Sequence, residues 1–412
     1  MTTKTFCPYA WNHLSSNANG GQRLCCNVID ASHIKNNEGN LVYINEIDNL
    51  LDYFNLDHYK RIRLNMLNGV ENPECQLCYN IEKNGGHSIR QYALKQYSYD
   101  EFKDITNQET GEISEVRVNY LDLSWSNKCN LQCRMCSPWA SDQLLPEYRD
   151  IGLSLPDNMD FDFMKKWKFE DISPVIEKVM TDHLNMILVT GGEPLVNNEF
   201  YKLCAELNKR GLSKNINLSF HTNLTVLPQK WDEVFAPFKS VTFKVSIDGV
   251  KDVYEYIRYP GKWSIIRDNI HEVCQAIMSG KDNFEIEFHT VFALYNMHGM
   301  TELFDFLLSL PNAKKIRRTP HINYVYNPAY ASPGNIPAAV KEQIIAKLEH
   351  WVSVEGPMLA VEKLSIIKAN IEILKQHSLP EDQIAINLDL LKKIDRRRNQ
   401  DTAKYIPWVL NV

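Results

Sequence analysis

Three cysteines within eight residues constrain this chain more than any other feature. Cys129, Cys133 and Cys136 are separated by three and then by two residues. The residues before them, 116–125, alternate apolar and polar side chains and are rich in β-branched and aromatic types, so they predict a strand. The thiols therefore follow the carboxyl end of a strand, which is where parallel α/β folds place their active sites.

Three closely spaced thiolates can share one metal centre, and cysteine-only loops commonly hold iron–sulfur clusters. A cubane cluster held by three cysteines has one iron open to a small molecule. The alternatives are a zinc knuckle that lacks a ligand, or three unrelated cysteines. Structural zinc sites usually combine a C-x2-C pair with a second, distant pair. The first spacing of this loop does not fit that pattern.

Composition and charge limit the classes of protein to consider. The 412 residues, 44% hydrophobic and 23% charged, are typical of a globular protein with two or three domains. The net charge of −6 gives no support to nucleic-acid binding, and we interpret the basic run 396–398 as a solvated helix face. No apolar run approaches membrane-spanning length and no signal pattern opens the chain, so we expect a cytoplasmic protein without a membrane partner. Ten cysteines in a reducing compartment favour metal binding.

Residues 116–325 alternate short apolar runs with helix-length segments, the pattern of βα units. Six predicted strands give an α/β fold with a partial (βα)6 TIM-like barrel. Residues 150–170 interrupt the rhythm and are interpreted as an insertion near the rim. The predicted strands are 121–125, 186–190, 216–220, 241–247, 284–292 and 315–324, and the predicted helices lie near 198–210, 228–238, 263–279 and 300–310.

Polar residues stand at the ends of several predicted strands. Gly191, Gly192 and Glu193 follow the second strand, where glycines let the backbone approach a ligand and a carboxylate offers an acceptor. Asn223 ends the third strand and Ser246 the fourth. Taken alone, each is as well explained by an ordinary strand-terminating turn.

The C-x3-C-x2-C loop after a strand resembles the radical S-adenosylmethionine (radical SAM) superfamily, and the Gly-Gly-Glu-Pro turn resembles its second motif. This resemblance implies that the three cysteines hold a 4Fe–4S cluster whose open iron binds S-adenosylmethionine. Met135 departs from the aromatic residue common in that place. Arg258 resembles an arginine near the cofactor carboxylate, and a surface ion pair is the alternative. The implied cofactor-binding residues are Met135, Gly191, Gly192, Glu193, Asn223, Ser246, Asp248 and Arg258.

The first 115 residues contain half of the ten cysteines. The turn at residues 19–21 predicts a hairpin that brings Cys7 and Cys25 together. Cys75 and Cys78 form a C-x2-C pair at a turn before a helix, after a long helix predicted within 46–69.

This amino-terminal region resembles the SPASM/twitch extension of radical SAM enzymes. Cys7, Gly20 and Cys25 fit its C-x(9–15)-G-x4-C pattern, and Cys75 and Cys78 fit the C-x2-C that follows. The two further cysteines of the longer pattern are missing, so the twitch-like form with one auxiliary 4Fe–4S cluster is the better match. The extension usually follows the barrel, and here it precedes it. A structural zinc site is the alternative, and Cys26 can replace Cys25 as a ligand.

The three predicted domains are a twitch-like auxiliary domain at 1–115, the barrel at 116–325 and a helical cap at 326–412. The cap is predicted from helical periodicity near 338–352, 358–376 and 380–397. Cys204 and Cys274 lie on apolar helix faces and are interpreted as buried, inert thiols.

The resemblance implies a radical SAM enzyme that reductively cleaves S-adenosylmethionine to a 5′-deoxyadenosyl radical, which removes hydrogen from a substrate. We expect a ribosomally made peptide as substrate, with a small sugar, nucleotide or cyclitol as the alternative. The hypothesis from another class is a non-catalytic iron–sulfur or zinc protein. An electron donor such as flavodoxin or ferredoxin is the implied partner. We also expect the auxiliary cysteines to face the strand ends that carry Cys129 and Glu193.

Overall fold

A computed structural model describes residues 4–27, 33–83, 85–124, 126–155 and 177–406. Most of the insertion expected at 150–170 lies outside these residues. By spatial clustering the chain divides into two units. The first unit comprises Met1–Ser126, Trp167–Ser219 and Pro237–Lys239, and the second comprises Asn127–Lys166, Phe220–Ala236 and Ser240–Val412.

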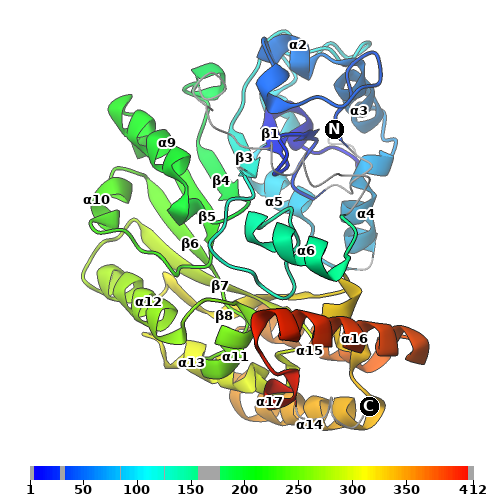
Figure 1. Cartoon of the computed structure of the whole chain (residues 1–412). Coiled ribbons are helices and arrows are strands. Elements are labelled where there is room, and N and C mark those ends of the chain that lie inside the picture. The colour runs from blue at the N-terminus through cyan, green and yellow to red at the C-terminus, as the bar shows by residue number, and fades with distance from the viewer. Residues whose placement is uncertain (1–3, 28–32, 84, 125, 156–176, 407–412) are drawn as a thin grey trace. The chain divides into compact units, whose positions relative to one another are not determined.

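The described strands form one eight-stranded sheet in the order β2-β1-β3-β4-β5-β6-β7-β8 (Figure 1). Strands β1 and β2 pair antiparallel, whereas β1–β3, β3–β4, β6–β7 and β7–β8 pair in parallel. The predicted α/β class with a mostly parallel sheet is therefore confirmed. The strands are β1 His13–Ser16, β2 Gln22–Arg23, β3 Tyr120–Ser124, β4 Met186–Thr190, β5 Asn217–Thr222, β6 Ser240–Ser246, β7 Phe284–Phe292 and β8 Ile316–Tyr324.

In the first unit, the predicted amino-terminal hairpin is confirmed. Ser15 pairs with Arg23 across it, and Gly20 takes a positive φ of 75° in its turn. Strand β1 also pairs in parallel with β3, so the amino-terminal segment extends the sheet beside the strand that leads to the cysteine loop. The helices of this unit are α1 Tyr9–Asn12, α2 Leu50–Phe54, α3 Asp57–Leu67, α4 Gln76–Lys83, α5 Ile89–Gln96 and α9 Asn198–Lys209.

The prediction of a single long helix within 46–69 is wrong, because the structure has two helices there, α2 and α3. The break falls at Asn55, whose side chain both donates to the carbonyl of Ile113 at 2.8 Å and accepts from its N–H at 2.9 Å. This long-range pairing takes the place of local helical continuation, and it leaves no mark in the periodicity of residues 46–69.

In the second unit, strand β6 shows why the sheet forms. Val241, Phe243 and Val245 are fully buried, while the alternate residues Lys244 and Ser246 are partly exposed, so one face is apolar and the other polar. The described helices are α6 Leu145–Ile151, α10 Trp231–Phe235, α11 Lys251–Ile257, α12 Trp263–Met278, α13 Met300–Ser309, α14 Ala338–Glu355, α15 Val361–Gln376, α16 Glu381–Arg398 and α17 Thr402–Tyr405.

Most of the predicted helices and strands of the second unit are confirmed to within a few residues, including the three long helices after residue 326. Helix α10 is shorter than predicted, because Lys230 takes a left-handed conformation with φ of 59° just before it. Cys204 of the first unit and Cys274 of the second are buried as predicted.

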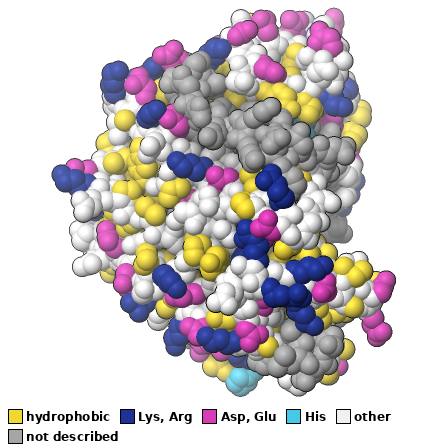
Figure 2. Space-filling model, in the orientation of Figure 1, with side chains coloured by type: hydrophobic (Ala, Val, Ile, Leu, Met, Phe, Trp, Pro, Cys, Tyr) yellow, Lys and Arg dark blue, Asp and Glu magenta, His cyan; other side chains and the backbone are white. Residues whose placement is uncertain are grey.

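Positive and negative side chains both occur over much of the face shown in Figure 2. Among the residues that the structure describes, no helix combines the length and apolarity needed to cross a bilayer.

Candidate metal centres

The cysteine loop follows β3 in the sequence and belongs to the second unit. The thiols of Cys129, Cys133 and Cys136 lie close to one another. A hydrogen bond between Cys133 and Cys136 lowers the pKa of the Cys133 thiol and raises that of Cys136, which burial and the nearby Cys129 raise further. The structure thus brings together the three cysteines that the sequence singled out.

The backbone of the loop is held by the end of α11 and the residues that follow it. Gln132 N–H donates to the carbonyl of Tyr259 at 2.6 Å, and Arg134 N–H donates to that of Ile257 at 2.9 Å. These bonds occupy the residues between the cysteines, so they fix the backbone from which the thiols project.

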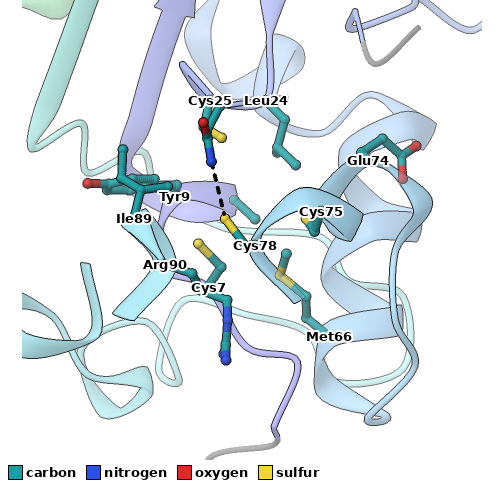
Figure 3. Close-up of a pocket in the computed structure, with 12 residues that line it drawn as sticks. Cys7, Tyr9, Leu24, Cys25, Met66, Glu74, Cys75, Cys78, Ile89 and Arg90 are labelled. Atoms are coloured by element: carbon teal, nitrogen blue, oxygen red, sulfur yellow. Dashed lines mark hydrogen bonds between the residues drawn. The ribbon is translucent and has the colours of Figure 1, made fainter. Parts of the chain in front are cut away.

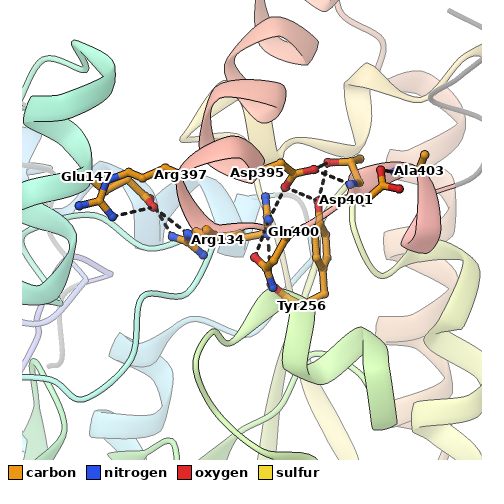
Figure 4. A network of polar contacts seen from close by, with 10 residues as sticks. Arg134, Glu147, Tyr256, Asp395, Arg397, Gln400, Asp401 and Ala403 are labelled. Atoms are coloured by element: carbon orange, nitrogen blue, oxygen red, sulfur yellow. Dashed lines mark hydrogen bonds and ion pairs between the residues drawn. The ribbon is translucent and has the colours of Figure 1, made fainter.

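A buried arginine anchors the same loop through its side chain (Figure 4). Arg134 is 1% exposed and its guanidinium donates to the carboxylate of Asp395, to Gln400 Oε1 at 2.8 Å and to the carbonyl of Tyr256 at 3.1 Å. It also lies 3.7 Å from the centre of the Tyr256 ring. A buried charge is stable only when it is paired, so Arg134 needs the carboxylate of Asp395 on α16, and that carboxylate needs Arg134.

A second buried ion pair joins α16 to α6. Arg398 and Glu147 form a two-point contact, with Nε and NH2 each 2.7 Å from a carboxylate oxygen. Arg397 pairs with Asp150 at 2.9 Å. The prediction that residues 396–398 form a solvated face is therefore wrong for Arg398, and only Arg396 lacks an ion pair among the described residues. The partners lie about 250 residues away in the sequence, beyond the reach of any local pattern.

Asp395→Asn should destabilise the second unit, because it leaves the buried Arg134 without its counter-charge. The loss expected for a broken buried pair is about 3 kcal/mol. Urea unfolding of the purified chain measures it. The matched control is Asp389→Asn on the same helix, whose exposed pair with Lys393 should contribute much less to stability. Equal effects of the two substitutions would contradict the anchoring role of Asp395.

Two further side chains of the second unit reach the sulfur atoms. Asn223, at the end of β5, donates to Asn130 Oδ1 at 2.9 Å and lies 3.9 Å from Cys129 Sγ. Arg258 NH1 lies 3.9 Å from Cys133 Sγ. Hydrogen bonds to cluster sulfurs are among the factors that set the potential of an iron–sulfur centre.

The carboxylate of Asp248 holds Arg258 in place at 2.6 Å. Asp248 is 1% exposed and also accepts from Val291 N–H at 3.0 Å, so the end of β6 is tied to β7. Arg258 Nε is buried and has no hydrogen-bond partner among the described residues. That orphaned donor, beside a cysteine thiol, suits the carboxylate of a small cationic cofactor. Ser246 ends β6 and Met135 lies in the cysteine loop, both partly exposed.

The glycine-rich turn lies in the first unit. Gly191 and Gly192 take positive φ angles of 78° and 56°. A Cβ at Gly191 would lie 2.6 Å from Ser124 Oγ and 2.7 Å from the carbonyl of Ser126, so only glycine fits against the end of β3. Glu193 is buried, and its carboxylate accepts from the N–H of Leu195 at 3.0 Å.

Gly191→Ala should destabilise the first unit and displace the end of β3, because backbone atoms block the added methyl group. Overpacking of this kind costs about 1–3 kcal/mol beyond the strain of the left-handed backbone. Gly211→Ala is the control, since Gly211 has φ of 69° and open space around it. A thermal melt of both variants compares them. An effect no larger at Gly191 than at Gly211 would contradict the close approach.

The amino-terminal cysteines form a second group, in the first unit. Cys7, Cys25, Cys75 and Cys78 line one cavity, which Tyr9, Met66 and Arg90 also line (Figure 3). The cysteines come from the residues before α1, after β2, and from the short helical turn Pro73–Cys75 and α4. The structure therefore brings together the four cysteines that the twitch pattern singled out.

Cys26 does not line this cavity. Burial raises the pKa of its thiol, and the next largest contribution comes from Asp122 on β3. Cys25, by contrast, interacts with Cys75 and Cys78, and burial raises its pKa to about 12. Between the two neighbouring cysteines, the geometry favours Cys25 as the ligand.

The four-cysteine cavity suits a metal centre chemically. Burial raises the pKa of Cys7, with Cys25, Cys75 and Cys78 adding to the shift, and burial together with Cys78 raises that of Cys75 to about 12. Such thiols stay protonated unless a cation stabilises their thiolates. Asn27 Nδ2 lies 3.7 Å from Cys78 Sγ, within reach for an N–H···S hydrogen bond. Four sulfur ligands fit either an iron–sulfur cluster or zinc.

Part of this chain is similar to proteins of known family. Residues 123–302 match the family model described as the Radical SAM superfamily. A GTP 3′,8-cyclase from Campylobacter lari is 24% identical over 175 residues, which cover 42% of this chain and 47% of the relative. A GTP 3′,8-cyclase from Clostridium botulinum is 30% identical over 137 residues, 33% of this chain and 37% of the relative. The chain thus spans less than half the length of these curated relatives.

Two solved structures show weaker likeness. Native anSMEcpe with bound AdoMet is 16% identical with a TM-score of 0.36, and the match covers 57% of this chain and 59% of that one. Streptococcus suis SuiB is 12% identical with a TM-score of 0.34, and the match covers 76% of this chain and 65% of that one. At these TM-scores the superpositions do not discriminate between substrates.

Proposed function

We propose that this chain, a radical SAM enzyme, uses Cys129, Cys133 and Cys136 to hold the 4Fe–4S cluster at which S-adenosylmethionine is reductively cleaved. The observation that carries this proposal is the convergence of the three thiols in a loop held by Arg134. When bound, the cluster supplies the electron that cleaves the cofactor to a 5′-deoxyadenosyl radical, which removes hydrogen from the substrate. The protein's own part is to bind, orient and keep water out.

The side chains around the loop then have defined tasks in this proposal. Arg258, held by Asp248, offers its free Nε–H to the cofactor carboxylate, and Asn223 orients Asn130 beside Cys129. The proposed cofactor-binding set is unchanged from the sequence: Met135, Gly191, Gly192, Glu193, Asn223, Ser246, Asp248 and Arg258. An electron donor such as flavodoxin or ferredoxin completes the proposed system.

Replacing Cys129, Cys133 and Cys136 by alanine should abolish 5′-deoxyadenosine formation, because the loop has no spare thiol. The assay uses anaerobically reconstituted, reduced protein with S-adenosylmethionine, and the product is measured by chromatography. Cys204→Ala is the control, since it removes a buried thiol from a helix of the first unit that holds no candidate ligand. Undiminished cleavage in the triple variant would overturn the assignment, and so would no cleavage in the wild type.

We also propose that Cys7, Cys25, Cys75 and Cys78 hold one auxiliary 4Fe–4S cluster. Their shared cavity supports this set, and zinc bound by the same four sulfurs is the alternative.

The wild-type chain should contain about eight irons, and Cys7→Ser/Cys75→Ser about four, if both clusters are cubanes. Cys26→Ala is the matched control and should keep the wild-type iron content. Cys25→Ala should lose iron, because Cys25 lines the cavity and its neighbour Cys26 does not. Metal analysis by mass spectrometry measures iron and zinc together. Stoichiometric zinc, or iron loss in Cys26→Ala rather than in Cys25→Ala, would contradict the proposed ligand set.

A ribosomally made peptide is the proposed substrate, by resemblance to SPASM/twitch enzymes. A nucleotide is the second candidate, because the curated relatives named above are GTP 3′,8-cyclases. Those alignments cover a minority of this chain, and members of one fold family often share cofactor chemistry while differing in substrate. GTP consumption by the reconstituted protein would favour the nucleotide.

A further inference from the structure

The polar face of strands β6, β7 and β8 carries a cluster of ionisable side chains that the proposed cofactor site does not use. Lys244 is paired in register with Glu287, and His289 with His321. On β7 the alternate residues Ile286 and Phe288 are fully buried, so the ionisable residues point to the other face of the sheet. All these residues belong to the second unit.

Glu287 is the centre of this cluster and is 2% exposed. Lys244 Nζ lies 2.5 Å from its Oε1, Arg317 NH1 donates to its Oε2 at 2.9 Å, and His289 Nε2 lies 3.1 Å from Oε1. Burial raises the pKa of Glu287, but His289 and Lys244 more than offset it, so the pKa falls well below its usual range. Both carboxylate oxygens are thus fully engaged in holding their neighbours.

Three histidines lie in a row across the strands. The ring centres of His221 and His289, and those of His289 and His321, are each 4.7 Å apart. Burial, with a smaller contribution from the cation of Lys244, lowers the pKa of His221 to about 3 and that of His321 to about 4. Neutral imidazoles each offer one N–H donor and one acceptor.

The position of this row ties it to the reaction centre. His289 is the register partner of Ser246, a proposed cofactor-binding residue. Lys244 lies two residues before Ser246 on the same face, a rise of about 7 Å along a strand. A substrate held by this cluster would therefore lie beside the cofactor.

The charge of the cluster distinguishes between a metal and an anion. Glu287, His289 and His321 place possible ligand atoms within 4.8 Å of one another, as a divalent metal site requires. However, Lys244 and Arg317 already supply two positive charges to Glu287, and Arg317 also pairs with Glu285 at 2.6 Å. Lys363 adds a third, near His321. These three cations outnumber the two carboxylates, Glu285 and Glu287, so they would repel a divalent cation and attract an anion.

We propose that Lys244, His289 and His321 bind an anionic oxygen group of the substrate, a carboxylate or a phosphate, with Glu287 holding these donors in position. The inference rests on the proposed function, because it treats the neighbourhood of Ser246 as the reaction site. Both candidate substrates carry such a group, so the chemistry is shared and the test separates its sources.

Calorimetric titration of the reconstituted protein with S-adenosylmethionine present tests the proposal. GTP against guanosine tests phosphate, and N-acetylglutamate against N-acetylglutamine tests carboxylate. In one of these pairs the anionic probe should bind at least about tenfold more tightly than its neutral counterpart, as a charge-assisted hydrogen bond allows. Lys244→Met/Glu287→Gln, which removes a cation and an anion together, should abolish that preference.

His321→Gln is the second variant, because its side chain is 42% exposed and its loss leaves the contacts of Lys244 and Arg317 with Glu287 intact. It should reduce the preference, and a thermal melt confirms that it folds. Lys230→Met, at a lysine 75% exposed before α10, is the control and should bind as the wild type. No anionic preference in the wild type, a preference retained in the double variant, or zinc binding that depends on Glu287, His289 and His321 would overturn the proposal. Failure of the proposed function would instead appear as absence of 5′-deoxyadenosine.

Discussion

The buried contact between Arg134 and Asp395 is the interaction on which the candidate centre of the second unit depends. Arg134 lies between two cysteines, and its guanidinium with 1% exposure needs a counter-charge, which Asp395 of α16 supplies. The same helix end pairs Arg398 with Glu147, so α16 is fastened to the loop and to α6. The carboxyl-terminal helices, which carry no motif, thereby become part of the scaffold that holds the three thiols together.

The proposed chemistry uses two groups of residues: those that bind the cofactor and those that bind the substrate. The three thiols, Asn223 and Arg258 form the proposed cofactor site, and they lie in the part of the chain that matches the Radical SAM superfamily. The cluster around Glu287 includes Lys244 of β6 and His289 of β7 and belongs to no motif that the sequence displays. Residues that bind a common cofactor can stay constant while neighbouring strand positions change the substrate, which is how one fold serves many reactions.

The apolar pattern predicted most strands and helices because each buries an apolar face, and β4 and β7 begin and end at the predicted residues. Both cysteine groups could also be predicted, since their spacing is local. Asp395, Glu147 and the β1–β3 pairing could not, because their partners lie roughly 100 to 260 residues away. The row of histidines was missed for a related reason: each stands on a different strand, and only the register of the sheet places them side by side.

The central claim is that the thiols of Cys129, Cys133 and Cys136 hold a cluster that binds S-adenosylmethionine directly. Electron paramagnetic resonance of the anaerobically reduced chain, recorded before and after addition of the cofactor, tests it most directly. The signal of a reduced 4Fe–4S cluster should change when the cofactor is added, and this change should be missing when the three cysteines are alanine. A spectrum that is identical with and without the cofactor in the wild-type chain would contradict the account.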